Sequence, residues 1–251
     1  SEYYQSKAES GSSAKEINEW VKKATNGKIE KILSQQELAD FFLVLANAIH
    51  FERDWQHAFD AQDTYLDEFV TPNGSIQTQM MHAVNKYMYI ENQDYQAVIL
   101  DYKNTVDVLM VLVLPKKNED FSFANAFLFE DIFKNFKTET IKIAVPKFKI
   151  EQATDVKDLL NQMGMSQLFD KPDFKPLVDT AHGPTKQALP KLKISKIAQK
   201  TLLAFSEKGT KASSATAVTI VEESCQQDPE YTKEICFNRP FLAALVTKEA
   251  P

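Results

Sequence analysis

The sequence predicts an α+β protein built largely from long antiparallel strands. Residues 64–114 contain several β-type runs separated by turn residues. Residues 13–33 and 155–168 instead carry apolar side chains at the three- and four-residue spacing of helices. The chain has no internal repeat and no low-complexity linker, so these segments are interpreted as parts of one α+β fold.

The first predicted element is a helix that begins near Ser13. Its apolar residues recur at helical spacing, and Gly27 ends the run before a second short helical piece. The next segment, residues 41–49, is almost continuously apolar. Such a run is typical of a strand that is buried on both faces.

The middle of the chain carries the clearest turn signals. The residues at 71–74, Thr-Pro-Asn-Gly, predict a tight hairpin. Pro146 interrupts the strand predicted at 141–150, which indicates an edge or a bend. Residues 155–168 predict a single amphipathic helix, and residues 192–205 form another strand-like run.

Composition excludes several classes of protein and partner. The net charge of −6 disfavours nucleic acid, because phosphate binding requires clustered Lys and Arg. No apolar run approaches the roughly 20 residues of a membrane helix. A chain of 251 residues can bury a sizeable core without metals or disulfides. We therefore expect no nucleic-acid partner, no membrane partner and no cofactor.

The sequence contains no recognisable catalytic or metal-binding pattern. The histidines, which are His50, His57, His82 and His182, do not form a metal-ligand pair. There is no G-x-S-x-G elbow and no glycine-rich phosphate loop among the six glycines. We expect a protein that is not an enzyme and has no metal site.

Two cysteines, Cys225 and Cys236, lie late in the chain. Their spacing excludes a C-x-x-C metal or redox site. Two unpaired thiols and a local disulfide that closes a loop of about ten residues remain alternatives. Composition does not decide the cellular compartment.

Residues 207–218 differ from an ordinary loop in their alternation. One face at period two carries small side chains, Thr210, Ala212, Ser214 and Thr216. Such side chains could enter an existing sheet without overpacking it. Gly209 gives the backbone the freedom of a hinge, and no proline between residues 190 and 229 removes an amide donor. Composition alone favours a flexible linker; the rest of the chain favours a strand that can insert.

This segment resembles the hinge of the serpins, in which an acidic residue, a variable residue, Gly and Thr precede small residues. An ordered set of motifs extends the resemblance from about residue 15 to the end: 17–21, 25–29, 47–51 with Trp55, 145–150, 160–164 and 237–241. The resemblance implies a multi-sheet α+β fold with a large central mixed sheet, surrounding helices and an exposed reactive loop. It assigns residues 1–251 to a single, incomplete serpin domain and residues 207–236 to its hinge and reactive-centre loop.

The chain departs from the family's pattern in several places. The family's N-terminal helices would precede Ser1 and its last strand would follow Pro251, so we expect an exposed apolar surface. Ala204 stands where the family often has Glu, and Gln199 where some members have His. Serines at 213–214 replace alanines, which could slow insertion slightly.

The resemblance implies a suicide-substrate inhibitor of proteases. In the family, a protease attacks the exposed loop and forms an acyl-enzyme, and the cleaved loop then inserts into the main sheet and traps the distorted enzyme. The inhibitor supplies stored free energy in place of catalytic residues. We expect a monomer whose partner is a serine protease or a papain-like cysteine protease. The alternative is a non-inhibitory serpin with a carrier, storage or chaperone role.

The family's functional residues carry over by position. The hinge comprises Glu207, Gly209, Thr210, Ala212, Ser214 and Thr216. The region where the sheet must open includes Asn47 and Trp55.

The position of the scissile bond depends on the direction of counting. Counting from the hinge places it at Glu223-Ser224, with Val221, Glu222 and Cys225 as neighbouring candidates. Counting back from residues 237–240 places it near Pro229 or Glu230. The acidic pair at 222–223 disfavours trypsin-like enzymes, whose pocket carboxylate would repel glutamate. A Glu-preferring serine protease and a papain-like cysteine protease fit about equally.

The resemblance favours an extracellular location, with an intracellular one as the alternative. Asn73 begins an Asn-Gly-Ser sequon and is a candidate for N-glycosylation.

Overall fold

The computed structural model describes residues 13–38, 43–105, 107–118, 120–170, 194–210 and 230–247. The chain divides into two compact units, Ser1–His50 with Ile150–Leu203, and Phe51–Lys149 with Ala204–Pro251. The helices are α1 (Ala14–Ala24), α2 (Gln35–Leu38), α3 (Leu128–Asn135), α4 (Lys157–Gln162) and α5 (Gln167–Asp170). Within the described ranges none of them is long and apolar enough to cross a membrane. That the chain forms a single domain stays a prediction.

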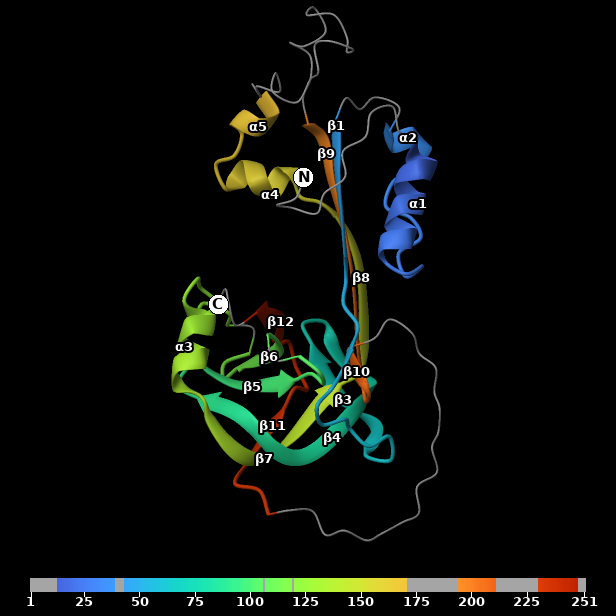
Figure 1. The fold of residues 1–251 in the computed structure, drawn as a ribbon. Helices are drawn as coiled ribbons and strands as arrows, with labels where there is room; N and C mark the ends of the chain where they lie inside the picture. Colours follow the sequence, from blue (N-terminus) through green and yellow to red (C-terminus); the bar gives the residue numbers. More distant parts are fainter. Residues whose placement is uncertain are drawn as a thin grey trace, which may run out of the picture. The chain divides into compact units, whose positions relative to one another are not determined.

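The strands belong to two mixed sheets (Figure 1). They are β1 (Leu43–His50), β2 (Arg53–Asp54), β3 (Thr64–Thr71), β4 (Gly74–Glu91), β5 (Tyr95–Asp101), β6 (Val108–Pro115), β7 (Lys137–Pro146), β8 (Phe148–Asp155), β9 (Ile194–Ser206), β10 (Gly209–Thr210), β11 (Lys233–Cys236) and β12 (Leu242–Thr247). The predicted α+β class is therefore confirmed.

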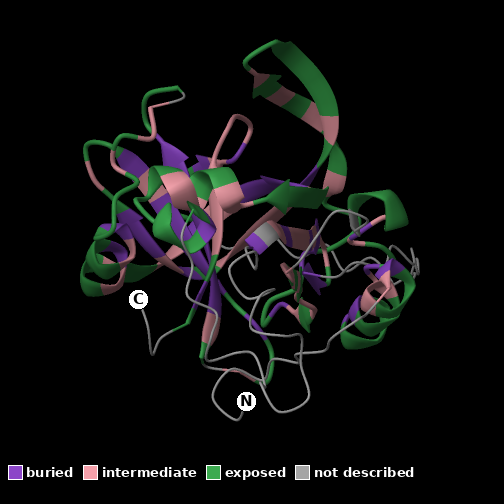
Figure 2. Cartoon of the chain, turned by 90° about the horizontal axis from the view of Figure 1, so that it is seen from above, coloured by how far each residue is buried: buried purple, intermediate pink, exposed green. Residues whose placement is uncertain are grey.

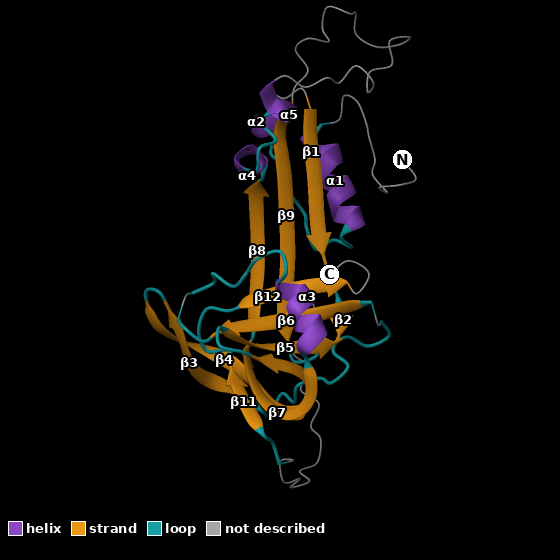
Figure 3. Ribbon diagram, turned by 90° about the vertical axis from the view of Figure 1, so that its left-hand side faces the viewer, coloured by secondary structure: helices purple, strands orange, loops and turns teal. Residues whose placement is uncertain are grey.

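In the first unit, β9 lies between β1 and β8 (Figure 3). β1 and β9 run parallel, and their register is continuous from Val44 opposite Lys196 to His50 opposite Leu202. No strand separates them over this length. They thus form a closed seam between parallel neighbours.

The helix predicted at the start of the chain is α1, and its polar residues explain its limits. Ser13 and Glu16 form a capping box, in which the Ser13 hydroxyl accepts from the Glu16 amide and the Glu16 carboxylate accepts from the Ser13 amide. Gly27, with φ of +80°, follows the last turn of the helix. The Asn18 side chain accepts from the amides of Ile32 and Leu33, which holds the returning chain against the helix.

The prediction that residues 41–49 form a strand buried on both faces is wrong for one face. Leu45 and Ile49 are 44% and 41% exposed, whereas the alternate residues of β1 are half-buried (Figure 2). On the half-buried face, Lys200 of β9 donates to the Lys31 carbonyl oxygen, so the segment after α1 lies there. A continuous apolar run predicts a strand, but it does not show whether both faces of that strand are covered.

The single helix predicted at 155–168 is also wrong. The structure has two short helices, α4 and α5, with a turn between them. Gly164 in that turn has φ of +88°, a left-handed conformation that breaks the helical hydrogen bonds. The apolar positions Leu159 and Met163 are exposed, so no packed face holds a longer helix together.

The second unit is built on the other sheet, with strand order β11-β7-β4-β5-β6-β12 and β3 paired to β4. The predicted turn at 71–74 is confirmed, because Thr71 pairs with Gly74 and closes the β3–β4 hairpin. The predicted interruption at Pro146 is confirmed too, since β7 ends there and β8 begins at Phe148. α3 contributes Leu128 and Ile132 to a core formed with β5 and β6.

Candidate functional site

The hinge predicted at 207–210 forms a tight hairpin in the second unit. β9 ends at Ser206, Glu207 and Lys208 make the turn, and β10 returns antiparallel to β9 with Gly209 opposite Ser206. The other edge of β10 pairs with β2, where Gly209 lies opposite Asp54. β10 is therefore flanked by a strand on each side.

β10 acts as a two-residue wedge between β2 and the end of β9. In the register of β1 and β9, His50 lies opposite Leu202. The same register would place Arg53 opposite Phe205. Instead, Thr210 lies between these two residues and pairs with both. β10 therefore lies between β2 and the end of β9 over two residues.

Trp55 supports the turn from which the wedge returns. Its indole nitrogen donates to the Ser206 carbonyl oxygen at 2.8 Å, and its backbone amide donates to the Lys208 carbonyl oxygen at 2.9 Å. Its ring is buried, stacks on Tyr102 at 4.6 Å and lies 4.7 Å from the Phe205 ring. Trp55, predicted to line the opening region, therefore binds the hinge turn directly.

Glu207 forms an ion pair with Lys147 at 2.8 Å on the turn of the hairpin. Burial alone would raise the pKa of Glu207. The hydrogen bond from Lys147 outweighs this effect, together with bonds from a backbone amide and from Thr64, and the pKa lies below its ordinary value. The carboxylate is consequently ionised at neutral pH.

Gly209 occupies a position that no other residue fits. Its φ is +155°, and a Cβ added there would overlap the Arg53 carbonyl oxygen and lie 2.7 Å from Asp54 Cα. The close approach of β2 therefore explains the glycine as well as any hinge freedom does.

The structure places the other predicted site residues differently. Asn47 lies in the first unit, on the exposed face of β1 opposite Gln199. Asn73 is exposed in the β3–β4 turn. Ala212, Ser214 and Thr216 of the hinge and Val221, Glu222, Glu223, Ser224 and Cys225 of the cleavage region lie outside the described residues. Cys236 is half-buried and forms no disulfide within the described part of the chain.

Two residues that the sequence interpretation did not assign complete the hinge site. Tyr102 approaches Thr210 with its hydroxyl, and Lys147 pairs with Glu207. Lys147 belongs to the motif at 145–150 that resembles the family, but the sequence did not indicate what this lysine binds. Tyr102 follows a buried strand with no motif around it.

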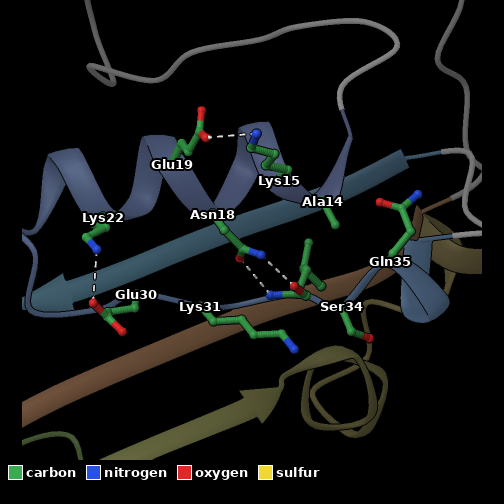
Figure 4. Close-up of a pocket in the computed structure, with 10 residues that line it drawn as sticks. Ala14, Lys15, Asn18, Glu19, Lys22, Glu30, Lys31, Ser34 and Gln35 are labelled. Carbon is green, nitrogen blue, oxygen red and sulfur yellow. Dashed lines mark hydrogen bonds and ion pairs between the residues drawn. The ribbon is translucent and has the colours of Figure 1, made fainter.

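A second concave region lies in the first unit, between α1 and residues 30–35 (Figure 4). It has a volume of about 370 Å³. Its charged side chains are engaged with one another, as in Lys22–Glu30 at 3.0 Å and Lys15–Glu19 at 3.9 Å. Across the described residues, no group of three or more His, Cys, Asp or Glu side chains could hold a metal ion.

A comparison with protein families matches residues 2–250 to the family described as "Serpin (serine protease inhibitor)". The chain belongs to the serpin family.

Individual serpins support this assignment over most of the chain. An uncharacterised serpin-like protein of Thermococcus kodakarensis is 34% identical over 94% of this chain and 53% of its own length. Human Serpin B4 is 31% identical over 92% of this chain and 58% of its own length. The native state of the thermophilic serpin tengpin superposes with a TM-score of 0.80 at 29% identity, over 94% of this chain and 60% of tengpin. The chain thus spans little more than half the length of these serpins.

Serpin membership constrains function only coarsely. Most serpins inhibit target proteases rather than catalyse reactions, and some members are not inhibitors. Thyroxine-binding globulin, solved with its thyroxine ligand, shares the fold with a TM-score of 0.74 at 23% identity. The family includes extracellular and intracellular members. Family membership therefore does not decide whether this chain inhibits a protease, and the residues of the hinge are the more specific indication.

Replacing Gly209 with Ala should lower the free energy of unfolding by about 3 kcal/mol or more, because the methyl group collides with the β2 backbone. Gly27→Ala is the matched control. Gly27 also has positive φ, but nothing lies within 4 Å of its added Cβ, so only about 1–2 kcal/mol should be lost. Urea denaturation measures both, and equal losses would contradict the close approach at β2.

Replacing Glu207 with Gln should destabilise the protein at pH 7. The loss of stability relative to the parent should become smaller as the pH is lowered. The pKa of Glu207 is depressed by folding, so its carboxylate stabilises the fold above the ordinary pKa of about 4.3, and this contribution fades as pH falls below that value. Thermal midpoints at pH 7 and pH 3.5 test this, with the exposed Glu19→Gln as control. A difference from the parent that grows in acid would show that the ion pair does not stabilise the hinge.

Proposed function

We propose that this serpin inhibits a serine protease or a papain-like cysteine protease as a suicide substrate. The observation that supports this is the wedge of β10, because the residue that must enter the sheet first, Thr210, already lies between β2 and β9. The protease would cleave the loop beyond the hinge. The remainder of the inserting strand would then follow Thr210 into the sheet.

The registers suggest the path of that strand. Continuing the antiparallel pairing of β10 with β9 places Ser214 opposite Thr201 and Thr216 opposite Gln199. Thr201 and Gln199 now pair with Ile49 and Asn47 of β1. Insertion would therefore open the seam between β1 and β9 and fill it with a strand antiparallel to both.

This path also decides the face on which each inserted side chain would lie. Residues that pair across strands point to the same face, so the small side chains would lie on the face of Asn47 and Ile49. The larger Lys211 would point to the opposite face. The parallel β1–β9 ladder would be replaced by two antiparallel ladders, which are slightly more stable per residue and more numerous. The cleaved protein would consequently resist heat better than the intact one.

The cleavage region points to the class of target. Val221 and the acidic pair at 222–223 suit a Glu-preferring serine protease or a papain-like enzyme, and Glu223-Ser224 is the proposed bond. The protein itself would act as a monomer and contribute no catalytic residue.

A non-inhibitory role is the competing function. A carrier or chaperone has no need of a strand that can insert, whereas Thr210 and the small residues after it suit insertion. The hinge therefore favours inhibition.

We further propose that the protein is extracellular and glycosylated at Asn73. The sequon lies at an exposed hairpin turn, where a bulky glycan meets no packed surface.

The parent protein should form a complex with its target that survives boiling in detergent. Thr210→Arg should be cleaved without trapping the protease, because a guanidinium cannot be accommodated at this fully buried position. Lys208→Glu, an exposed change in the same turn, is the control and should still trap. A panel of serine and cysteine proteases, read by gel electrophoresis and by sequencing of the cut loop, provides the measurement. Unchanged trapping by Thr210→Arg would sink the insertion mechanism.

Expression in a secreting eukaryotic cell should yield a protein whose mass falls on treatment with a peptide N-glycosidase. Asn73→Gln should lack this shift, because the sequon is removed. A parent that shows no shift would exclude glycosylation at this turn in that host.

A further inference from the structure

We propose that Tyr102 anchors the wedge by binding the Thr210 hydroxyl, and so fixes the register from which the loop inserts. This inference rests on the proposed function, since the depth of the wedge affects trapping only if the loop inserts.

The two hydroxyl groups form a buried pair. The Tyr102 hydroxyl lies 2.8 Å from Thr210 Oγ1, and the residues are 2% and 0% exposed. A buried hydroxyl without a partner is costly, so neither group can be separated from the other without a loss of stability. Burial raises the pKa of Tyr102, which keeps the phenol neutral and the bond intact at physiological pH.

The Tyr102 ring is held rigidly, so its hydroxyl has a fixed position. The ring stacks on Trp55 and meets Phe51 edge-on at 4.9 Å. The backbone around it is tied to the segment that follows β2, because the Gln56 amide donates to the Asp101 carbonyl oxygen at 2.8 Å and the Lys103 amide to the Asp54 carbonyl oxygen at 2.8 Å. The partner for Thr210 is therefore preorganised.

This fixed partner selects one register for β10. A slip by one residue would bring Gly209 or Lys211 opposite the Tyr102 hydroxyl. Gly209 offers no side chain, and Lys211 would carry a charge into a buried site. A one-residue slip would also exchange the two faces of the incoming strand, which would put Lys211 on the face of the small residues. Of Gly209, Thr210 and Lys211, only Thr210 therefore offers the Tyr102 hydroxyl a neutral side-chain partner.

The consequence is kinetic. After cleavage, insertion competes with hydrolysis of the acyl-enzyme, which releases the protease and leaves a cut, spent inhibitor. A wedge held in register gives insertion a formed starting point. Without the anchor, more of the protein would start from an expelled hinge, and more would be consumed per trapped protease.

The test compares Tyr102→Phe, Thr210→Val, the double variant and Thr210→Ser with the parent, against a protease that the parent traps. Tyr102→Phe and Thr210→Val should each raise the number of inhibitor molecules consumed per trapped enzyme about threefold or more. The double variant should be no worse than either single one, because no hydroxyl is then left unpaired. Thr210→Ser keeps the hydroxyl and should behave as the parent does.

Tyr95→Phe is the matched control. The Tyr95 hydroxyl also donates a hydrogen bond in the fold, to Asp131 at 2.6 Å, and the Tyr95 ring lies against Phe123. It should lower the thermal midpoint without changing the stoichiometry of inhibition. If Tyr102→Phe also lowers the thermal midpoint without changing the stoichiometry of inhibition, Tyr102 has only a structural role and the proposal is overturned. A Tyr102→Phe variant that traps more efficiently than the parent overturns it as well, since the bond would then restrain insertion.

The outcome for the parent separates this inference from the proposed function. If the parent traps no protease in the panel, the proposed function fails. In that case the anchor is tested by the free energies of unfolding of Tyr102→Phe, Thr210→Val and the double variant. If the double variant loses as much stability as the two single variants together, the two hydroxyls are not coupled and the anchor is overturned. If Tyr102→Phe does not fold, Thr210→Val and Thr210→Ser carry the same comparison.

Discussion

A strand can enter the interior of a sheet only where two neighbouring strands are parted, because the amides that bond across their seam must lose these partners before they can bond to the new strand. In this serpin the parting is built in at one place, where Thr210 separates Arg53 from Phe205. The remaining features of the hinge serve this wedge. Gly209 permits the close approach of β2, and Trp55 fastens the turn. Under the proposed mechanism, insertion would start from this wedge and part β1 from β9, which now pair without interruption from Val44 to His50.

Membership of the serpin family does not by itself establish the mechanism of this protein. The serpin match covers residues 2–250 and establishes the family, whose fold thyroxine-binding globulin shares. The fold leaves open whether the loop can insert, and the residues of the hinge bear on this question. A buried threonine, held between two strands and followed by small residues, suits a segment that inserts. Function is therefore argued from a few residues rather than from the match.

The sequence predicted best the features that local chemistry controls. The turn at 71–74 and the left-handed Gly27 that follows the first helix depend on backbone preferences of their own residues. The apolar run of β1 could not reveal which face is the more exposed one, and the periodicity of residues 155–168 did not show the left-handed conformation of Gly164. At the site, Tyr102 and Thr210 are 108 positions apart, so no local pattern could have paired them. The resemblance supplied Gly209 and Thr210 without the contacts that explain them.

The stacking of Trp55 on Tyr102 makes the hinge a natural spectroscopic probe. The chain has two tryptophans, of which Trp20 on α1 is 37% exposed and Trp55 is 1% exposed. The emission of the buried indole depends on its hydrogen bond to Ser206 and on the rings around it. With Trp20 replaced by Phe, the tryptophan fluorescence of the protein would come from Trp55 alone. Movement at the entrance of the sheet could thus be followed in real time without any attached dye.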